Sequence, residues 1–347
     1  MIEFTKKGIF CPAGDFYIDP WGKVERAIIT HAHADHARTG MGSYLAHESS
    51  KALMRLRLGR HIQLQTVGYA EPIYINGVRV SLHPAGHVPG SAQIKVEHKG
   101  EVWVISGDYK VEADGFSTPF EPIKCHNFVS ECTFGMPVFK WEDQYQIYHK
   151  INEWWLHNAN EGRASVIYAY SLGKAQRILH HLNQDIGPVY VHGAVWNINE
   201  ALKEDGHQLP ECLRPAKEHS KQDFRKCLVI TPPSARGTPW LNKFAPFESA
   251  MASGWMALRG NKRRQALDVG FILSDHADWP GLNAAIAATE AEKIYLTHGY
   301  KASFARYLNE KGIQAFEVDT LFSGDDTDEI YTFEHEAVAE VMPEVKP

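Results

Sequence analysis

The chain has 347 residues, of which 44% are hydrophobic and 22% charged, and this balance excludes an intrinsically disordered protein. Its length exceeds that of one typical core, so we expect about two domains. No apolar stretch reaches 18 residues and the N-terminus has no apolar signal region, which predicts a cytoplasmic protein without a transmembrane helix. Five cysteines without paired short spacing favour reduced thiols over a disulfide framework.

The net charge of −6 is unevenly distributed along the chain. Residues 317–344 contain ten Asp and Glu and no Lys or Arg, whereas residues 1–316 contain 35 basic and 32 acidic side chains. A mildly basic body can bind phosphates locally, because the field at a cleft steers ligands rather than the total charge. Basic clusters at residues 51–60, 214–226 and 259–264 are candidates for such a surface, and solvated helix faces or loops are the alternative.

The segment HAHADH at residues 31–36 places three histidines and a carboxylate directly after the apolar run 27–29. Imidazole and carboxylate ligands together suit zinc, or manganese as a harder substitute. A polar loop that contains histidines by chance is the alternative. Candidate ligands that would complete a two-metal site follow downstream, and their presence counts against this chance explanation. The candidates in this segment are His31, His33, Asp35 and His36.

Three further candidates, His87, Asp108 and His298, also follow predicted strands. His87 lies in a Gly/Pro-rich loop between the alternating segments 78–82 and 93–96. Asp108 and His298 each close a short apolar strand. Every candidate ligand therefore lies near a strand end, which predicts an open metal site on the loop edge of a sheet sandwich.

The pattern changes along the chain. Residues 1–135 alternate short strands with turns, and residues 141–160 are predicted to be helical. From residue 164 a strand at 165–169, a glycine loop at 171–173, a helix at 174–182 and strands at 188–191 and 228–231 follow, which indicates α/β structure with a parallel sheet. We therefore predict an insertion at 141–270 between two parts of one domain, 1–140 and 271–347. The second part includes the acidic tail, whose apolar residues could form a final strand; they are Phe322, Ile330, Tyr331 and Phe333.

The inserted segment has a second chemical signal at Ser171, Lys174 and Arg177, where a predicted helix begins directly after a strand. Amides at a helix N-terminus favour anions, although ordinary helix capping explains the same pattern. The spacing is not that of a P-loop, so the motif does not indicate nucleoside triphosphate binding. We predict that these residues, together with Ser253, bind a nucleic-acid backbone.

The sequence resembles the metallo-β-lactamase superfamily through HAHADH at 31–36. SECTFG at 130–135, LSDHAD at 273–278 and THG at 297–299 resemble motifs A, B and C of the β-CASP nucleases. Along its whole length, including residues 14–20 and 169–176, the chain is similar to the bacterial ligase-associated DNA exonucleases. The resemblance implies an α/β protein, a metallo-β-lactamase αββα sandwich with an inserted α/β β-CASP domain.

The same resemblance implies a dinuclear centre of two divalent ions, zinc or manganese. One ion would be held by His31, His33 and His87, the other by Asp35, His36 and His298, with Asp108 bridging both. The catalytic residues would be Asp35, Asp108 and His276, the last being a general acid paired with Glu131. Asp19 and Asp275 are candidates for orienting ligand imidazoles, and turn capping is the alternative for both.

The implied activity is exonucleolytic hydrolysis of single-stranded DNA ends, from the 5′ side, in repair with an ATP-dependent DNA ligase and a helicase. RNA processing is the main alternative, because motif C has a histidine where the Artemis-like DNA-repair branch typically has valine. A small-molecule metallohydrolase would need neither the insertion nor the pair of Glu131 and His276. A non-catalytic scaffold is disfavoured, because all seven ligands are present.

Overall fold

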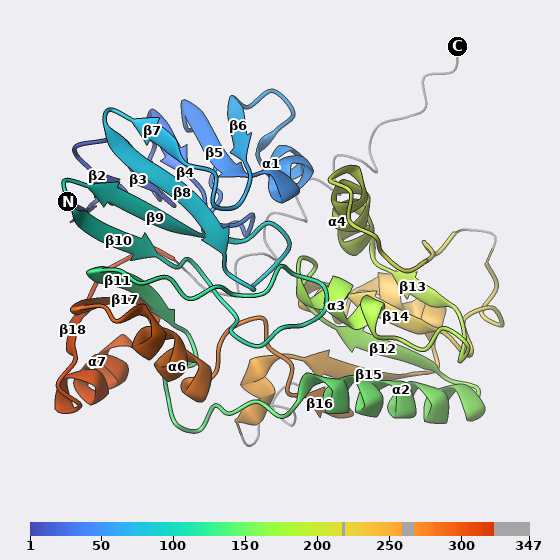
Figure 1. Ribbon diagram of the computed structural model, residues 1–347. Helices are drawn as coiled ribbons and strands as arrows, with labels where there is room; N and C mark the ends of the chain where they lie inside the picture. The colour runs from blue at the N-terminus through green and yellow to red at the C-terminus, as the bar shows by residue number, and fades with distance from the viewer. Residues whose placement is uncertain (217–218, 259–266, 323–347) are drawn as a thin grey trace, which may run out of the picture. The chain divides into compact units, whose positions relative to one another are not determined.

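The structure, a computed structural model, describes residues 1–216, 219–258 and 267–322 (Figure 1). The chain forms two compact units. Unit 1 comprises Met1–Trp141, Ala201–His207 and the described residues from Asp275 to Phe322, and unit 2 comprises Glu142–Glu200 and the described residues of Gln208–Ser274. Residues 201–207 thus belong to unit 1, which the sequence did not indicate. The predicted mixed α/β class is confirmed, because both units combine sheets with helices.

Unit 1 contains two sheets. The first has six strands in the order β1 (Glu3–Thr5), β2 (Gly8–Cys11), β3 (Phe16–Ile18), β4 (Arg26–Ile28), β5 (Ser43–His47) and β6 (Leu64–Val67). The second has seven, in the order β18 (Gln314–Glu317), β17 (Lys293–Gly299), β11 (Asn127–Cys132), β10 (Glu101–Ile105), β9 (Ala92–His98), β8 (Val78–Pro84) and β7 (Ile73–Ile75). Ile18 and Ile28 of the first sheet share one core with Val80 and Ile94 of the second, so the two sheets pack face to face.

Two helices cover the other face of the seven-stranded sheet. Leu282 of α6 (Trp279–Thr289) and Phe304 of α7 (Lys301–Glu310) share a core with Phe128 of β11. The next residue, Val129, belongs instead to the core between the sheets. Successive side chains of a strand point to opposite faces, so β11 is buried on both sides and is apolar at both positions. Helix α1 (Lys51–Leu58) follows β5.

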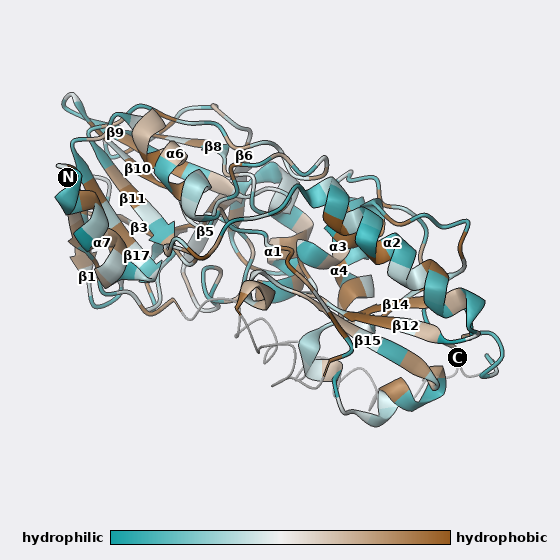
Figure 2. Cartoon of the chain, turned by 90° about the horizontal axis from the view of Figure 1, so that it is seen from below, coloured by the Kyte–Doolittle hydropathy of each residue, from teal (hydrophilic) through white to brown (hydrophobic). Residues whose placement is uncertain are grey.

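Unit 2 is built on a five-stranded parallel sheet with the order β13 (Val189–Val191), β14 (Leu228–Thr231), β12 (Ala164–Tyr168), β15 (Phe247–Ala252) and β16 (Val269–Phe271). The sheet has a core on each face. Trp155 of α2 (Gln144–Asn160) and Ile178 of α3 (Lys174–His180) contribute to one core, and Phe224 and Phe244 to the other. Helix α4 (Gly193–Glu204) follows β13. Strands β12 and β14 are predominantly hydrophobic, as strands buried on both faces must be (Figure 2).

The predicted elements agree with the structure except at their ends and at α1, a helix within the region 1–135 where strands and turns were predicted. The helix predicted at 141–160 begins at Gln144, because the Asp143 side chain accepts a hydrogen bond from the amide of Tyr145 and caps it. The helix predicted at 174–182 ends at His180. The basic cluster at 259–264 and the tail residues Ile330, Tyr331 and Phe333 lie outside the described residues. Among the described residues, none of the helices is long and apolar enough to cross a membrane.

Candidate metal centre

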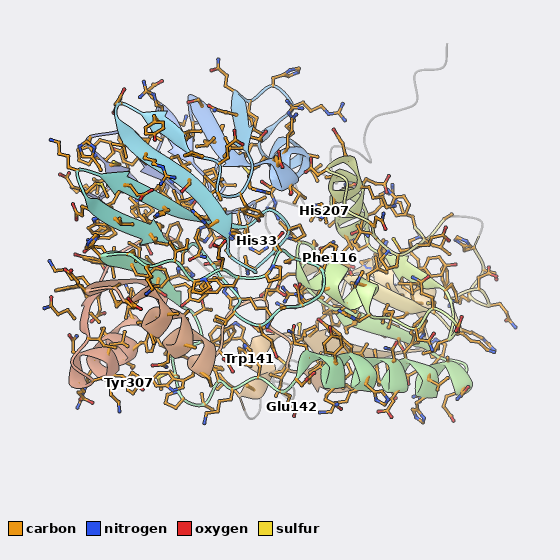
Figure 3. All side chains as sticks on the ribbon, in the orientation of Figure 1. His33, Phe116, Trp141, Glu142, His207 and Tyr307 are labelled. Atoms are coloured by element: carbon orange, nitrogen blue, oxygen red, sulfur yellow. The ribbon has the colours of Figure 1, made fainter. Side chains whose placement is uncertain are left out.

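The candidate ligands come together near the ends of strands in unit 1. One of them, His33, is labelled in Figure 3. His31 and His36 follow β4, His87 follows β8 and Asp108 follows β10. The approach of these segments depends on Gly107, which has a positive φ of 58°. A Cβ atom there would lie 2.5 Å from Thr30 Oγ1, so a larger residue would push the segments of His31 and Asp108 apart.

Asp108 is the centre of the cluster. Its carboxylate belongs to three groups of side chains whose ligand atoms lie within 4.8 Å of one another: His31, His33, His87 and Asp108; His36, Asp108 and His298; and Asp108, Glu131 and His276. Asp108 Oδ2 is 3.5 Å from Nε2 of both His31 and His36, and Oδ1 is 2.9 Å from His298 Nε2. Asp108 is therefore placed to serve two ion positions at once.

Hydrogen bonds at Nδ1 determine which ring nitrogen of His36 and His87 points towards the cluster. His36 Nδ1 lies 2.7 Å from the carboxylate of Asp19, and His87 Nδ1 lies 2.9 Å from the carbonyl oxygen of Asp275. Both oxygens can only accept, so Nδ1 carries a proton and Nε2 is the nitrogen on the side of Asp108. Asp275, an orienting candidate from the sequence, thus acts on His87 through its main chain.

His31 and His298 are each oriented by the threonine that precedes them in the chain. Thr30 Oγ1 lies 3.0 Å from Nδ1 of His31, and Thr297 Oγ1 lies 3.0 Å from Nδ1 of His298. Each hydroxyl donates its own hydrogen elsewhere, to Asp19 and to the carbonyl of Ser130 respectively, so each accepts a hydrogen bond from Nδ1. The repeated Thr-His dipeptide is a sequence signal for these orienting residues, which our sequence reasoning missed.

Four of the clustered histidines form two pairs according to the direction in which their pKa is shifted. Burial lowers the pKa of both His31 and His87 well below the usual value, which keeps them neutral and able to bind a metal ion. Burial also acts to lower the pKa of His36 and His298, but the Asp108 carboxylate outweighs it and raises both. The pKa of Asp108 is lowered despite burial, because His36 and His298 stabilise its charge.

The residues present fit a divalent metal centre. Four buried ligand atoms make no well-aligned hydrogen bond among the described residues: His31 Nε2, His36 Nε2, Asp108 Oδ1 and His298 Nε2, the last two lying 2.9 Å apart. Buried polar atoms of this kind are costly unless something pairs with them. Imidazole and carboxylate donors suit zinc and manganese. The clustered side chains can therefore bind metal ions.

Asp35 and His33 take different positions in the cluster. His33 Nδ1 lies 3.0 Å from His87 Nε2, so His33 faces the centre through Nδ1 rather than Nε2. Asp35 Oδ2 lies 3.7 Å from His36 Nε2, beside the group formed by His36, Asp108 and His298 but outside it. Of the seven predicted ligands, Asp35 alone is not in one of the two matching groups.

Glu131 and His276 form a buried pair at the edge of the cluster. His276 Nδ1 lies 2.9 Å from both carboxylate oxygens of Glu131. The amide of Tyr109 and the hydroxyl of Thr133 donate to the same carboxylate, which fixes its orientation. The ring centroid of His276 is 4.8 Å from that of His87. The imidazole is thus oriented by a carboxylate beside the candidate metal ligands, as a proton donor requires.

The four predicted substrate contacts all lie in unit 2. Lys174 Nζ lies 4.3 Å over the ring of Tyr170, and Arg177 Nη1 donates to the carbonyl of Ser274. Lys174 and Arg177 are buried, with 1% and 0% of their surfaces exposed. Ser171 and Ser253 are buried as well, and the Ser253 hydroxyl accepts from the amide of Trp255. The sequence did not indicate this burial.

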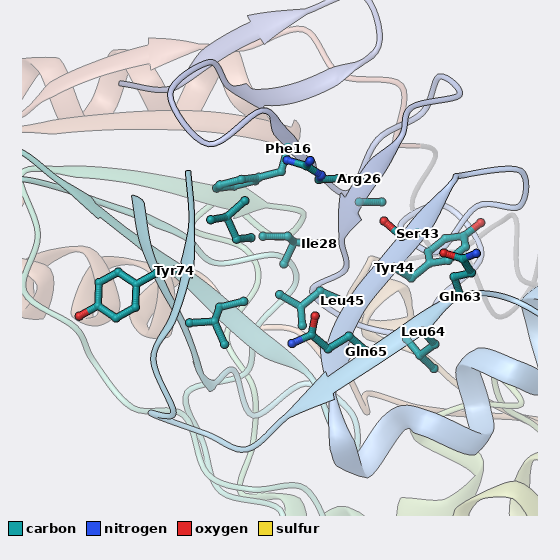
Figure 4. A pocket seen from close by; sticks show the side chains of 13 residues that line it. Phe16, Arg26, Ile28, Ser43, Tyr44, Leu45, Gln63, Leu64, Gln65 and Tyr74 are labelled. Carbon is teal, nitrogen blue, oxygen red and sulfur yellow. The ribbon is translucent and has the colours of Figure 1, made fainter. Parts of the chain in front are cut away.

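The hollow beside His36 and His298 has a volume of only about 10 Å³, and a larger groove lies elsewhere in unit 1. It has a volume of about 530 Å³ and is lined mainly by residues of β4, β5, β6 and β7 (Figure 4). Its side chains include Arg26, Tyr44, Gln65 and Tyr74, and none of the candidate ligands. Size alone therefore does not identify the chemical site of this protein.

No family model matches the chain. The chain is 29% identical over 315 residues to a protein of Opitutus terrae named "Probable DNA ligase", which covers 90% of this chain and 30% of that protein. Over 163 residues it is 25% identical to the endoribonuclease YSH1 of Saccharomyces cerevisiae, covering 36% and 21% of the two chains. Over 141 residues it is 29% identical to the RNase aCSPSF2 of Saccharolobus solfataricus, covering 39% and 28%. The chain thus spans less than a third of the length of these relatives.

A solved structure has a similar fold. It is a protein of unknown function from Enterococcus faecalis V583, with a TM-score of 0.57 and 12% sequence identity over 85% of this chain and 79% of that one. At this identity the likeness concerns the fold alone.

Proposed function

We propose that the protein is a metal-dependent DNA exonuclease that hydrolyses the phosphodiester bonds of single-stranded ends. Residues 1–140 and 271–347 would form a metallo-β-lactamase domain, and residues 141–270 an inserted β-CASP domain. The single observation that carries the proposal is the buried cluster around Asp108, with an oriented histidine and glutamate pair beside it. A phosphodiesterase needs both parts, one for the phosphoryl charge and one for the leaving oxygen.

In this proposal His31, His33 and His87 would hold one divalent ion, Asp35, His36 and His298 would hold the other, and Asp108 would serve both. When bound, the ions supply positive charge that polarises the phosphoryl group and acidifies a water molecule. Each protein ligand is oriented by its neighbours. Four histidines donate from Nδ1 to a fixed acceptor: His31 to Thr30, His36 to Asp19, His87 to the carbonyl of Asp275 and His298 to Thr297.

His276 would donate a proton to the leaving oxygen. Because Nδ1 is hydrogen-bonded to Glu131, Nε2 would be the nitrogen that donates the proton. Glu131 is itself held by Tyr109 and Thr133, so the pair is oriented before substrate binds. A small-ester hydrolase has no need of such an acid when its leaving group is stable as an anion.

A polymeric substrate is supported by unit 2. Strands β12 and β15 are neighbours, and the chain leaves them towards opposite edges of the sheet. In open parallel sheets, ligands bind outside the carboxyl ends of strands at such a switch point. The loops that follow these two strands carry Ser171 and Ser253. We propose that they contact the nucleic-acid backbone, and that Lys174 and Arg177, although buried, bind the same backbone by adding positive charge beneath these loops.

We propose DNA rather than RNA as the substrate because of the share of this chain that each relative matches. The relative that matches 90% of this chain is named for DNA ligation, whereas the two ribonucleases match 36% and 39% of it. We therefore propose a role in DNA repair in the cytoplasm, beside an ATP-dependent DNA ligase and a helicase. RNA processing is the second candidate, supported by those ribonucleases.

The decisive experiment compares DNA and RNA strands of one sequence, labelled at either end, with and without a 5′-phosphate. We expect faster cleavage of DNA and first release of the label from the 5′ end. Backbone binding also predicts steep inhibition by salt and little preference for base. Faster RNA cleavage would replace the DNA proposal by the RNA one, and hydrolysis of small esters alone would refute both.

A further inference from the structure

The chain segment that carries Glu131 also contacts His276 from a second side. The indole Nε1 of Trp141 donates to the main-chain carbonyl of His276 at 3.0 Å. The amide of Trp141 donates to the carboxylate of Asp278 at 2.8 Å, and the amide of Trp279 donates to the carbonyl of Phe139 at 3.0 Å. Residues 131–141 and 276–279 are thus joined at both main chain and side chain.

Aromatic packing completes this clasp, by which we mean the contacts between residues 131–141 and 276–279. The ring of Phe134 lies edge-on to Trp141 at 4.8 Å and to His276 at 5.9 Å between centroids. Phe139 packs against Phe134 at 4.9 Å. Phe134 and Phe139 are fully buried, and edge-to-face aromatic pairs favour one relative orientation. The main chain of His276 therefore has little freedom to shift away from Glu131.

We propose that Trp141 is a positioning residue for the general acid, holding the His276 main chain so that its imidazole stays aligned with Glu131 and the leaving oxygen. This inference rests on the proposed function. The physical reason is that Glu131 orients the imidazole through Nδ1, whereas a shift of the His276 main chain would carry the whole imidazole with it. The indole bond at the carbonyl of His276 removes this motion. A displacement of about 1 Å in a reacting group can cost about a hundredfold in rate.

The test uses Trp141→Phe, which keeps an aromatic ring and removes the N–H donor. Two substrates separate the roles: a DNA oligonucleotide, whose leaving oxygen needs a proton, and the p-nitrophenyl ester of thymidine 5′-phosphate, whose leaving group is stable as an anion. On the oligonucleotide we expect kcat to fall by about 10- to 100-fold with KM and bound metal unchanged. On the p-nitrophenyl ester we expect a change of less than about twofold, because the acid contributes little there.

Trp155→Phe is the matched control. Trp155 is buried in unit 2 and its Nε1 also donates to a main-chain carbonyl, that of Lys226, at 3.0 Å. The control loses the same kind of hydrogen bond away from His276, so its kcat on the oligonucleotide should stay within about twofold of wild type. Phe134→Leu is a second variant that loosens the same clasp. It replaces Trp141→Phe in the test if Trp141→Phe folds poorly, and the same difference between the two substrates is expected.

Three results would overturn the inference. Equal losses on the two substrates would mean that Trp141 supports the metal centre rather than the acid. An unchanged kcat on the oligonucleotide would mean that the indole bond is dispensable. Loss of bound metal in Trp141→Phe would assign it a structural role. All three would leave the proposed function intact, whereas wild-type protein inactive on both substrates would refute the function itself.

Discussion

The orienting role of Asp19 makes a testable prediction about metal affinity. Asp19 is buried, with 1% of its surface exposed, and its carboxylate accepts three hydrogen bonds. Oδ1 accepts from the amide of Thr30, and Oδ2 accepts from the Thr30 hydroxyl and from His36 Nδ1. The substitution Asp19→Asn keeps the volume of the side chain and replaces one of these acceptors by an N–H donor.

The expected loss follows from the geometry. If the amide oxygen serves the Thr30 amide, the new NH₂ group faces His36 Nδ1, which must then accept a hydrogen bond. The imidazole proton moves to Nε2, the atom that lies 3.5 Å from Asp108 and that we propose as a metal ligand. Loss of such an orienting contact typically weakens metal binding by about 10- to 100-fold. This corresponds to about 1.4 to 2.8 kcal/mol of binding free energy.

The assay is a competition titration of zinc between the protein and a chromophoric chelator at neutral pH. Asp114→Asn is the matched control, because Asp114 is also buried and accepts from the amides of Phe116 and Ser117 through one oxygen. We expect the control to bind zinc as tightly as wild type does. Equal affinity of Asp19→Asn and wild type would refute the assignment of the Nδ1 proton of His36 to Asp19.

Three further predictions concern metal content, the acid and pH. Wild-type protein should bind about two transition-metal ions per chain by elemental analysis, and Asp108→Ala should lose the most, since it would serve both; one ion or none in an active enzyme would contradict this. His276→Ala should keep its metal and lose about 10²- to 10⁴-fold in turnover, and loss of an ion instead would make His276 a ligand. Burial and His207 lower the pKa of His47 to about 4, so His47 stays neutral in the folded protein. The free energy of unfolding is therefore full above pH 6.5 and falls as the pH drops towards 4, because the unfolded chain binds the proton first. In denaturant titrations of metal-free protein from pH 7 to 4.5, wild type should lose about 2 kcal/mol more than His47→Gln, and parallel curves would contradict the prediction.

The chemistry of this protein is largely readable from its local sequence. Residues 31–36 indicate metal binding, because four ligand side chains crowd one strand end. Alternating hydrophobicity locates β8 and β9, since the period of side chains along a strand is a local property. The parallel sheet of unit 2 follows from the alternation of strands and helices for the same reason.

The tertiary structure alone decided how the side chains are oriented and which of them are buried. The Nδ1 partners of His36 and His87 come from residues 17 and 188 positions away in the chain, and one of them is a main-chain carbonyl that any residue could supply. The burial of Lys174 and the contact of Trp141 with His276 likewise have no local signature. Hydrogen bonds between distant segments depend on how the sheets bring strand ends together, and residue spacing carries no information about that.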